Sequence, residues 1–283
     1  MSKAPRFLSG GVTSDPWDNL KRLTAARVAL GRAGVSLPTS AHLEFQLAHA
    51  EARDAVHACL DAEQLAEKVR DKGLTCFVGR SSAADREEYL QRPDLGRTLD
   101  EDTKKSLSDW QEEKGSPEFD LSIVISDGLS ARAVRDHSLP MLANLITLAE
   151  EEGWSLSPVV IARQGRVAIG DEIGHQFSAR MVVLMIGERP GLSSPDSLGI
   201  YFTFQPKPGL KDDSRNCISN IRPEGLSYAL ASHKLAGLLR GANERRLSGV
   251  QLKDDSELVA VDSDIADIGN FLAIADIKDI GDS

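Results

Sequence analysis

The feature that most constrains the fold is an alternation, after Pro117, of short apolar runs with helical segments. The apolar runs are rich in β-branched residues and are short enough to be buried strands. They lie at 119–125, 157–162, 181–186 and 198–204, and helical patterns at 139–152 and 171–178 come between them. This alternation predicts an α/β fold, a Rossmann-like sheet domain covered by helices.

The residues before this alternation predict a smaller, mainly helical portion. Leu20, Leu23 and Leu30 have helical spacing, and Gly31 is placed to end a helix over 19–30. Ser40 is a candidate cap for a second helix running to about residue 60, and 74–78 is a short strand candidate. We therefore expect a helical amino-terminal region over 1–115, an α/β domain over 116–240 and an acidic tail over 241–283.

Charge and composition exclude several classes of protein. The net charge is −10, and residues 251–283 hold nine acidic residues against two lysines, which gives −7 of that total. An acidic chain argues against a nucleic-acid partner, because phosphate contacts require clustered Lys and Arg. The tail has few aromatic residues and is expected to be disordered. No apolar run approaches the roughly 20 residues of a membrane span, and no secretion signal is evident.

The three cysteines, Cys59, Cys76 and Cys217, are widely spaced, which predicts reduced thiols and a cytoplasmic protein. His42, His49 and His57 recur at about two helical turns. At 1.5 Å per residue this separates them by about 10 Å, too far for one metal ion. The sequence also lacks a phosphate-binding Walker segment, a dinucleotide fingerprint and a nucleophile elbow.

Three loops follow predicted strands, where ligands of open α/β sheets usually bind. Residues 126–130 predict either a well-made turn capped by Ser130 or a binding loop. At 187–191, Glu188 either pairs with its neighbours or accepts hydrogen bonds from a ligand. At 215–220, Cys217 has no nearby histidine, so contact with a ligand or plain burial is favoured over nucleophilic catalysis.

Six segments, in order and spacing, resemble the small chain of ethanolamine ammonia-lyase. They are 26–34, 45–56, 92–97, 124–130, 186–192 and 217–221, and the resemblance covers about 20–239. It implies a subunit of an adenosylcobalamin-dependent radical enzyme that converts ethanolamine to acetaldehyde and ammonia. A large barrel-forming subunit would bind ethanolamine and the adenosyl group, and this chain would cover the nucleotide side of the cobalamin and be active only in that hetero-oligomer.

The resemblance also implies which residues contact the cofactor. Three positions match the family's cobalamin contacts: Val167, Glu188 and Cys217. Glu188 would accept hydrogen bonds from corrin amides, Val167 would offer backbone and an apolar wall, and Cys217 would pack near the corrin. None is expected to act as acid or base. No residue is expected to bind a metal, because the cofactor would keep its own lower axial base; His137 and His175 therefore need no metal role.

Two alternatives and one question of location stay open. The chain could be a non-catalytic cobalamin-carrier or scaffold module of the same fold, or an independent small-molecule enzyme with a degenerate dinucleotide site. Some relatives carry a longer amino-terminal extension linked to packaging in a protein-shelled microcompartment, whereas this chain reaches its first family motif early. We therefore expect a cytoplasmic location, with a bacterial microcompartment as the alternative.

Overall fold

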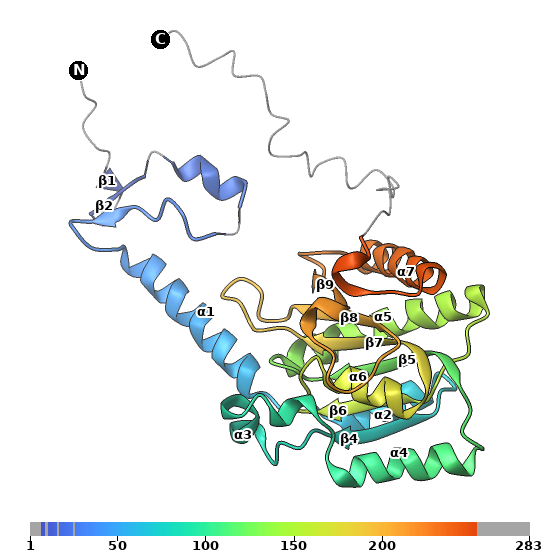
Figure 1. The fold of residues 1–283 in the computed structure, drawn as a ribbon. Coiled ribbons are helices and arrows are strands. Elements are labelled where there is room, and N and C mark those ends of the chain that lie inside the picture. The colour runs from blue at the N-terminus through green and yellow to red at the C-terminus, as the bar shows by residue number, and fades with distance from the viewer. Residues whose placement is uncertain (1–6, 9–10, 16, 25, 254–283) are drawn as a thin grey trace.

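The structure is a computed structural model that describes residues 7–8, 11–15, 17–24 and 26–253. Its centre is a six-stranded sheet with the strand order β4-β6-β5-β7-β8-β9 (Figure 1). The first four strands are parallel to one another, while β8 and β9 continue the sheet in antiparallel pairing. The strands are β4 (Cys76–Arg80), β5 (Phe119–Ser126), β6 (Val159–Arg163), β7 (Ala179–Gly187), β8 (Leu198–Phe204) and β9 (Arg215–Ile221). The predicted α/β class is confirmed.

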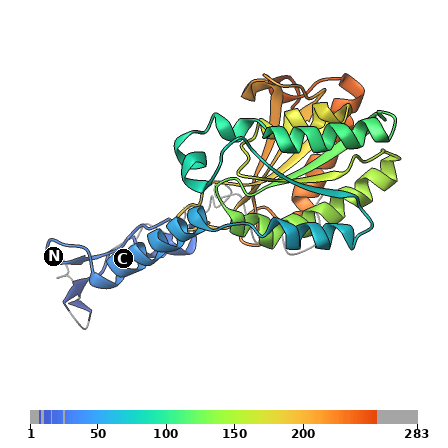
Figure 2. The same cartoon turned by 90° about the horizontal axis from the view of Figure 1, so that it is seen from below.

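Helices cover both faces of this sheet, because successive residues of a strand point to opposite sides. On β5, Ile123 and Ile125 face one apolar core while Val124 faces the other. Figure 2 shows helices on the two sides of the sheet. One face is covered by α2 (Ala62–Arg70), α5 (Ala131–Glu152) and α7 (Tyr228–Arg245), and the other by α4 (Glu101–Glu113) and α6 (Ile169–Gln176).

The turn after β5 forms as its sequence predicts. Ser130 is the N-cap of α5, and its hydroxyl accepts a hydrogen bond from the Ala133 amide at 3.2 Å. Gly153, in the left-handed conformation with φ of 67°, ends the same helix. Strand, turn and helix are therefore joined with their backbone groups satisfied.

The amino-terminal part differs from its prediction. It holds a small antiparallel sheet of β1 (Phe7–Leu8), β2 (Val12–Thr13) and β3 (Arg32–Ala33), the 3-10 turn η1 (Asp18–Arg22), and the helix α1 (Thr39–His57). The predicted helix over 19–30 is wrong, because only the short turn η1 forms there. Leu20 and Leu23 are exposed, so no buried apolar face stabilises a longer helix. The second predicted helix is confirmed, although Pro38 rather than Ser40 occupies its N-cap.

Residues 17–24 and 26–57, which we call the arm, project from the sheet domain (Figures 1 and 2). The carboxyl-terminal end of α1 joins the arm to the sheet domain, where the Arg86 Nε atom donates to the Val56 carbonyl at 2.8 Å. A second link joins Arg27 Nη2 to the Leu192 carbonyl at 3.3 Å. These two hydrogen bonds link the arm to the sheet domain, while most of α1 stands away from the sheet.

Several elements lie outside the predicted domain limits. Strand β4 and helix α2 come from the 1–115 region, yet both pack into the sheet domain. Strand β9 forms where the sequence predicted a loop over 215–220, and α7 continues to Arg245. The division at 115 and 240 stays a prediction, and the tail beyond residue 253 lies outside the described residues. Within the described part, no helix is both long and apolar enough to span a membrane.

Candidate functional site

The site lies where the parallel strands β5, β6 and β7 end, because their carboxyl ends meet at one edge of the sheet. Glycine permits the close backbone approach of the loops there. A Cβ atom on Gly187 would lie 2.1 Å from the Ser130 carbonyl oxygen, and one on Gly165 would lie 2.5 Å from Ser126 Oγ. Gly128 has φ of +52° and faces the Gly187 carbonyl oxygen. These contacts leave no room for a side chain.

Polar links fix the loops after β5 and β6 to each other. Ser126 Oγ donates to the Ala162 carbonyl at 2.7 Å and accepts from the Gly165 amide at 3.0 Å. The Asp127 carboxylate accepts from the Gln164 amide at 2.6 Å. Burial raises the pKa of Asp127, and the Arg86 guanidinium opposes that rise. The floor of the site is therefore held rigidly by buried hydrogen bonds.

One wall of the site is a stack of two guanidinium groups on a tyrosine ring. Arg86 lies 4.8 Å and Arg166 lies 4.2 Å from the centre of the Tyr89 ring, and the Tyr89 hydroxyl donates to the Gly165 carbonyl at 3.2 Å. Burial raises the pKa of Tyr89 to about 12. Two buried nitrogens of this stack, Arg86 Nη2 and Arg166 Nε, have no hydrogen-bond partner among the described residues.

The Glu188 carboxylate follows β7 and is held by three donors. Its Oε2 accepts from Ser197 Oγ at 2.5 Å and from the Asn220 amide at 3.1 Å, and its Oε1 accepts from Ser219 Oγ at 2.6 Å. A carboxylate has about four lone-pair sites. One site on Oε1 therefore stays open to a ligand, and the carboxylate is already oriented by β9 and the 188–197 loop.

These elements enclose a depression of about 370 Å³, which we call the strand-end hollow. Its lining includes Tyr89, Gly128, Val167, Glu188, Tyr201 and Ser219. Two of the three residues predicted to contact cofactor, Val167 and Glu188, thus come from different strand-loop units to one hollow. This arrangement offers hydrogen-bond acceptors, hydroxyl donors and an apolar wall side by side.

Cys217, the third predicted residue, is not part of the lining but lies beside residues that are. It faces Tyr201 across the β8–β9 ladder and is two residues from Ser219, and both of these neighbours line the hollow. Cys217 is exposed overall, but partial desolvation of its thiol by the surrounding protein raises its pKa; the Tyr201 hydroxyl opposes this rise, and the Glu188 carboxylate adds to it. A thiol with a raised pKa is a poor nucleophile at neutral pH. Contact with a ligand is the chemistry that this position supports.

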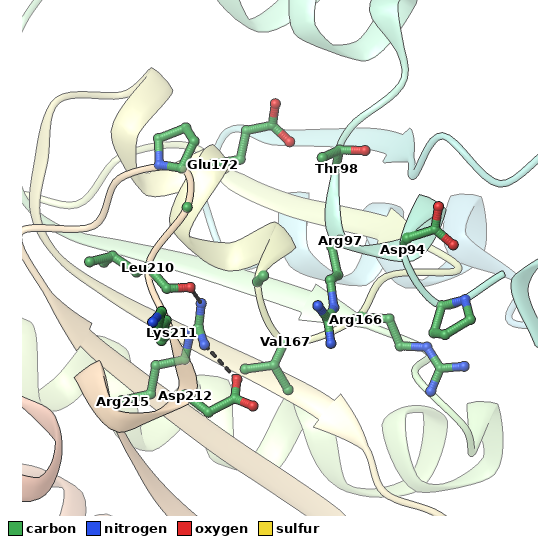
Figure 3. Close-up of a pocket in the computed structure, with 14 residues that line it drawn as sticks. Asp94, Arg97, Thr98, Arg166, Val167, Glu172, Leu210, Lys211, Asp212 and Arg215 are labelled. Carbon is green, nitrogen blue, oxygen red and sulfur yellow. Dashed lines mark hydrogen bonds and ion pairs between the residues drawn. The ribbon is translucent and has the colours of Figure 1, made fainter.

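A larger cavity of about 780 Å³ adjoins the first and shares Arg166 and Val167 with it; we call it the lateral cavity. Figure 3 shows its lining, with the Arg97 guanidinium directed toward Val167. On the opposite side Arg215 pairs with Asp212 Oδ1 at 2.7 Å and donates to the Leu210 carbonyl at 3.0 Å. Within the described ranges, no three His, Cys, Asp or Glu side chains gather as a metal site.

Sequence reasoning missed the basic residues of both hollows. Arg97 lies in a segment noted only for its family resemblance, and Arg86, Tyr89 and Lys211 carried no recognisable pattern. Arg86 and Tyr89 lie on helix α3 (Arg86–Gln91), Arg97 lies in the turn before α4, and Lys211 lies in the loop before β9. Only the folded sheet brings these segments together. A useful signal was present in the density of arginines over 86–97, where three occur in twelve residues.

The fold and its site define an open-sheet α/β protein with polar loops gathered at the carboxyl ends of its parallel strands. Comparison with known proteins is more specific. The sequence model of the family described as ethanolamine ammonia-lyase light chain matches residues 14–253. The chain therefore belongs to the ethanolamine ammonia-lyase light chain family.

Individual relatives are similar along nearly their whole length. A protein of Azotobacter vinelandii named ethanolamine ammonia-lyase small subunit is 58% identical over 260 residues, covering 92% of this chain and 96% of the relative. The same name is given to a Pseudomonas fluorescens Pf-5 protein that is 55% identical over 262 residues, covering 92% of this chain and 95% of the relative. A Pseudomonas aeruginosa PAO1 relative is 53% identical over 271 residues, covering 96% and 99%.

Proposed function

We propose that this chain is the small subunit of an adenosylcobalamin-dependent ethanolamine ammonia-lyase. It binds the nucleotide side of the cofactor, while a large subunit binds ethanolamine and carries the reaction to acetaldehyde and ammonia. The observation that carries this proposal is that Val167 and Glu188 line the strand-end hollow from separate segments, with Cys217 next to two further lining residues, Tyr201 and Ser219. Family membership supports the same conclusion.

The chemistry of the hollow fits a corrin with amide arms around its rim. Such a ligand needs acceptors for amide N–H groups, donors for amide oxygens and apolar surface for the ring edges. The open lone-pair site of Glu188, the Ser219 hydroxyl and the Val167 side chain supply these three in one place. When bound, the cofactor supplies homolytic cobalt–carbon cleavage, which begins the radical elimination.

This chain's own residues bind and orient in this proposal, and they do not transfer protons. Glu188 is preorganised by three donors, so an amide arm that donates to it loses little entropy in ordering the carboxylate. Val167 presents a partly buried apolar wall, and Cys217 lies beside Tyr201. Close backbone contacts at Gly128, Gly165 and Gly187 hold the loops around the hollow in place.

The arm supports the proposed association with a large subunit. Of the nine large hydrophobic side chains exposed among the described residues, eight lie between Trp17 and Leu47. An apolar surface concentrated in this way is typical of protein–protein contacts. The arm is anchored beside the site through Arg86 and Val56, so a subunit that covers the arm also approaches the strand-end hollow.

Co-expression with the large subunit tests this function. We expect a stable complex that releases ammonia from ethanolamine when adenosylcobalamin is added. Glu188→Gln should leave the complex intact but weaken its affinity for cobalamin about tenfold, because a charge-assisted hydrogen bond is lost. Binding is measured by titration of cobalamin absorbance.

Glu113→Gln is the matched control, because Glu113 is an exposed carboxylate at the end of α4 and lines neither the strand-end hollow nor the lateral cavity. Failure to form a complex, or a cobalamin-loaded complex without ammonia release, would contradict the proposed function. The second result would favour a carrier or scaffold module instead. An unchanged cobalamin affinity in Glu188→Gln would contradict the proposed contact at the strand-end hollow.

A further inference from the structure

His137 on α5 is buried, and its ring contacts two other segments of the chain. Its Nδ1 atom lies 2.7 Å from the Tyr228 hydroxyl at the start of α7. Its Nε2 atom lies 3.6 Å from Asp196 Oδ2, in the loop between β7 and β8, and has no hydrogen-bond partner within the described residues. A buried polar atom without a partner costs free energy and calls for an explanation.

The neighbours of the His137 ring determine which of its nitrogens carries the proton. A carboxylate only accepts hydrogen bonds, so an Nε2 atom without a proton would place two acceptors against each other. The neutral ring therefore carries its proton on Nε2, and Nδ1 accepts from the Tyr228 hydroxyl. At 3.6 Å the Nε2–H group is slightly too far from Asp196 for a full hydrogen bond. The attraction between them is still effective, because both side chains are mostly buried and water screens them little.

Asp196 is held from its other side by Arg222, which follows β9. Asp196 Oδ1 lies 3.4 Å from Arg222 Nη1, and the same nitrogen donates to the Ser193 carbonyl at 3.2 Å. Arg222 Nε donates to Asn220 Oδ1 at 3.1 Å. His137 and Arg222 thus hold one carboxylate of the loop after β7 between α5 and the end of β9.

Both sides of this arrangement lead to Glu188. Ser197 directly follows Asp196, and its hydroxyl donates to Glu188 Oε2 at 2.5 Å. Asn220, which Arg222 contacts, donates its amide to the same oxygen at 3.1 Å. Two of the three donors that orient the Glu188 carboxylate are therefore joined to the groups that hold Asp196.

We infer that His137 is a positioning residue for the cofactor site: its Nε2–H group holds Asp196, and through Ser197 this contact keeps Glu188 oriented toward the strand-end hollow. The inference rests on the proposed function and extends it to a residue that lines neither the strand-end hollow nor the lateral cavity. His137 itself touches no cofactor and transfers no proton. The same contact accounts for the buried Nε2 atom, for which Asp196 is the acceptor.

The test compares His137→Asn with His137→Gln in the assembled complex of this chain with its large subunit. A Gln side chain places an amide N–H near the position of Nε2 and can still donate to Asp196, whereas the shorter Asn side chain cannot reach it. We expect His137→Asn to weaken cobalamin binding about fivefold and His137→Gln to bind within about twofold of the wild-type complex. Absorbance titration measures binding without turnover. His175→Asn is the control, because His175 is an exposed histidine on α6 that lines neither cavity.

Two further variants separate positioning of Glu188 from a general effect on stability. If His137 acts through Glu188, His137→Asn should cause no further loss of affinity in a complex that already carries Glu188→Ala. A purely structural role would add its loss in both backgrounds. Asp196→Ala removes the acceptor without changing α5, and it should weaken cobalamin binding at least as much as His137→Asn. Asp196→Ala also keeps the inference testable if His137→Asn does not fold.

Each contrary outcome is distinguishable. Unchanged cobalamin affinity in His137→Asn and Asp196→Ala, with Glu188→Ala still weakened, would overturn the inference and leave the proposed function standing. Equal losses in His137→Asn and His137→Gln, or a loss that adds to that of Glu188→Ala, would assign His137 to packing alone. If the wild-type complex binds no cobalamin, the proposed function itself fails, and the role of His137 fails with it.

Discussion

At the carboxyl ends of β5 and β7, the position of single atoms determines which residues can be accommodated. The backbone around Gly187 approaches the Ser130 and Asp127 carbonyl oxygens so closely that a Cβ atom would lie 2.1 and 2.5 Å from them. Backbone atoms cannot move aside as the end of a flexible side chain can. The same close approach brings Glu188 next to the turn that caps α5.

Gly187→Ala should therefore destabilise the folded chain by about 1–3 kcal/mol, the usual cost of forcing extra volume into a packed site. Urea unfolding followed by circular dichroism measures the change. Gly241→Ala is the control: it lies inside α7, its new Cβ would meet only the Leu252 side chain at 3.4 Å, and loss of a helical glycine should stabilise by about 0.5–1 kcal/mol. Equal stability of the two variants would refute the close-packing argument.

Glu188 illustrates what a residue's sequence context leaves undecided. Its place after a strong strand marked it as a ligand contact or as a partner of nearby residues. The structure gives it three intramolecular donors, two of them from residues 219 and 220 on β9. Pairing with neighbours and contact with a ligand are therefore compatible. The three donors fix the carboxylate, and a fixed carboxylate presents its remaining lone pair in a defined direction.

At the scale of elements, exposed apolar surface is concentrated on the arm. On α1 only small residues, Ala48, Ala52 and Ala55, are buried, whereas Leu43 and Leu47 are 57% and 62% exposed. Helix α1 is therefore stabilised by its contacts with the sheet domain at one end only. Phe45 stacks on His49 of the same helix, while Leu43 and Leu47 remain largely exposed.

Replacing Leu43 and Leu47 together by Ser should weaken association with the large subunit by at least tenfold, because about 1.5–3 kcal/mol is lost for each buried leucine. The stability of this chain by itself should change little, since both side chains are exposed. Analytical ultracentrifugation of the mixed subunits measures association. Val250→Ser, at a residue 75% exposed beyond α7, should have no effect; a comparable loss there would show that the arm is not the specific contact.

At the scale of the whole molecule, a buried ion pair ties the antiparallel edge of the sheet to a covering helix. Asp171 on α6 accepts hydrogen bonds from Arg215 on β9, and both side chains are almost fully buried. Arg215 also reaches Asp212, which is 95% exposed. The pair joins segments 44 residues apart and places the 208–212 loop beside the lateral cavity.

Asp171→Asn should cost about 3–5 kcal/mol of folding free energy, because it leaves the Arg215 charge buried without its counter-ion. Asp212→Asn removes an exposed partner of the same arginine and should cost no more than about 1 kcal/mol. Urea midpoints of the two variants measure the difference. Combining Asp171→Leu with Arg215→Met should recover most of the loss; a double variant as unstable as Asp171→Asn would contradict this account.

The sequence by itself determined the alternation of strands and helices, the Ser130 cap and the loops that follow β5 and β7. These depend on local periodicity and turn chemistry, which neighbouring residues fix. Family motifs in the sequence also predict Val167, Glu188 and Cys217 as cofactor contacts, and this stays a prediction. The failed helix over 19–30 shows the limit of periodicity, since the apolar spacing of Leu20 and Leu23 has no surface to cover.

Only the tertiary structure decided that β9 is a strand, that β4 joins the sheet from the 1–115 region and that Arg97, Arg166 and Lys211 surround one cavity. The polar 215–221 stretch is a strand because its backbone pairs with β8. Its local sequence pattern does not predict this pairing. The cations come from separate loops and meet because parallel strands end at one edge of the sheet. Their proximity follows from topology, which depends on contacts between residues far apart in the sequence.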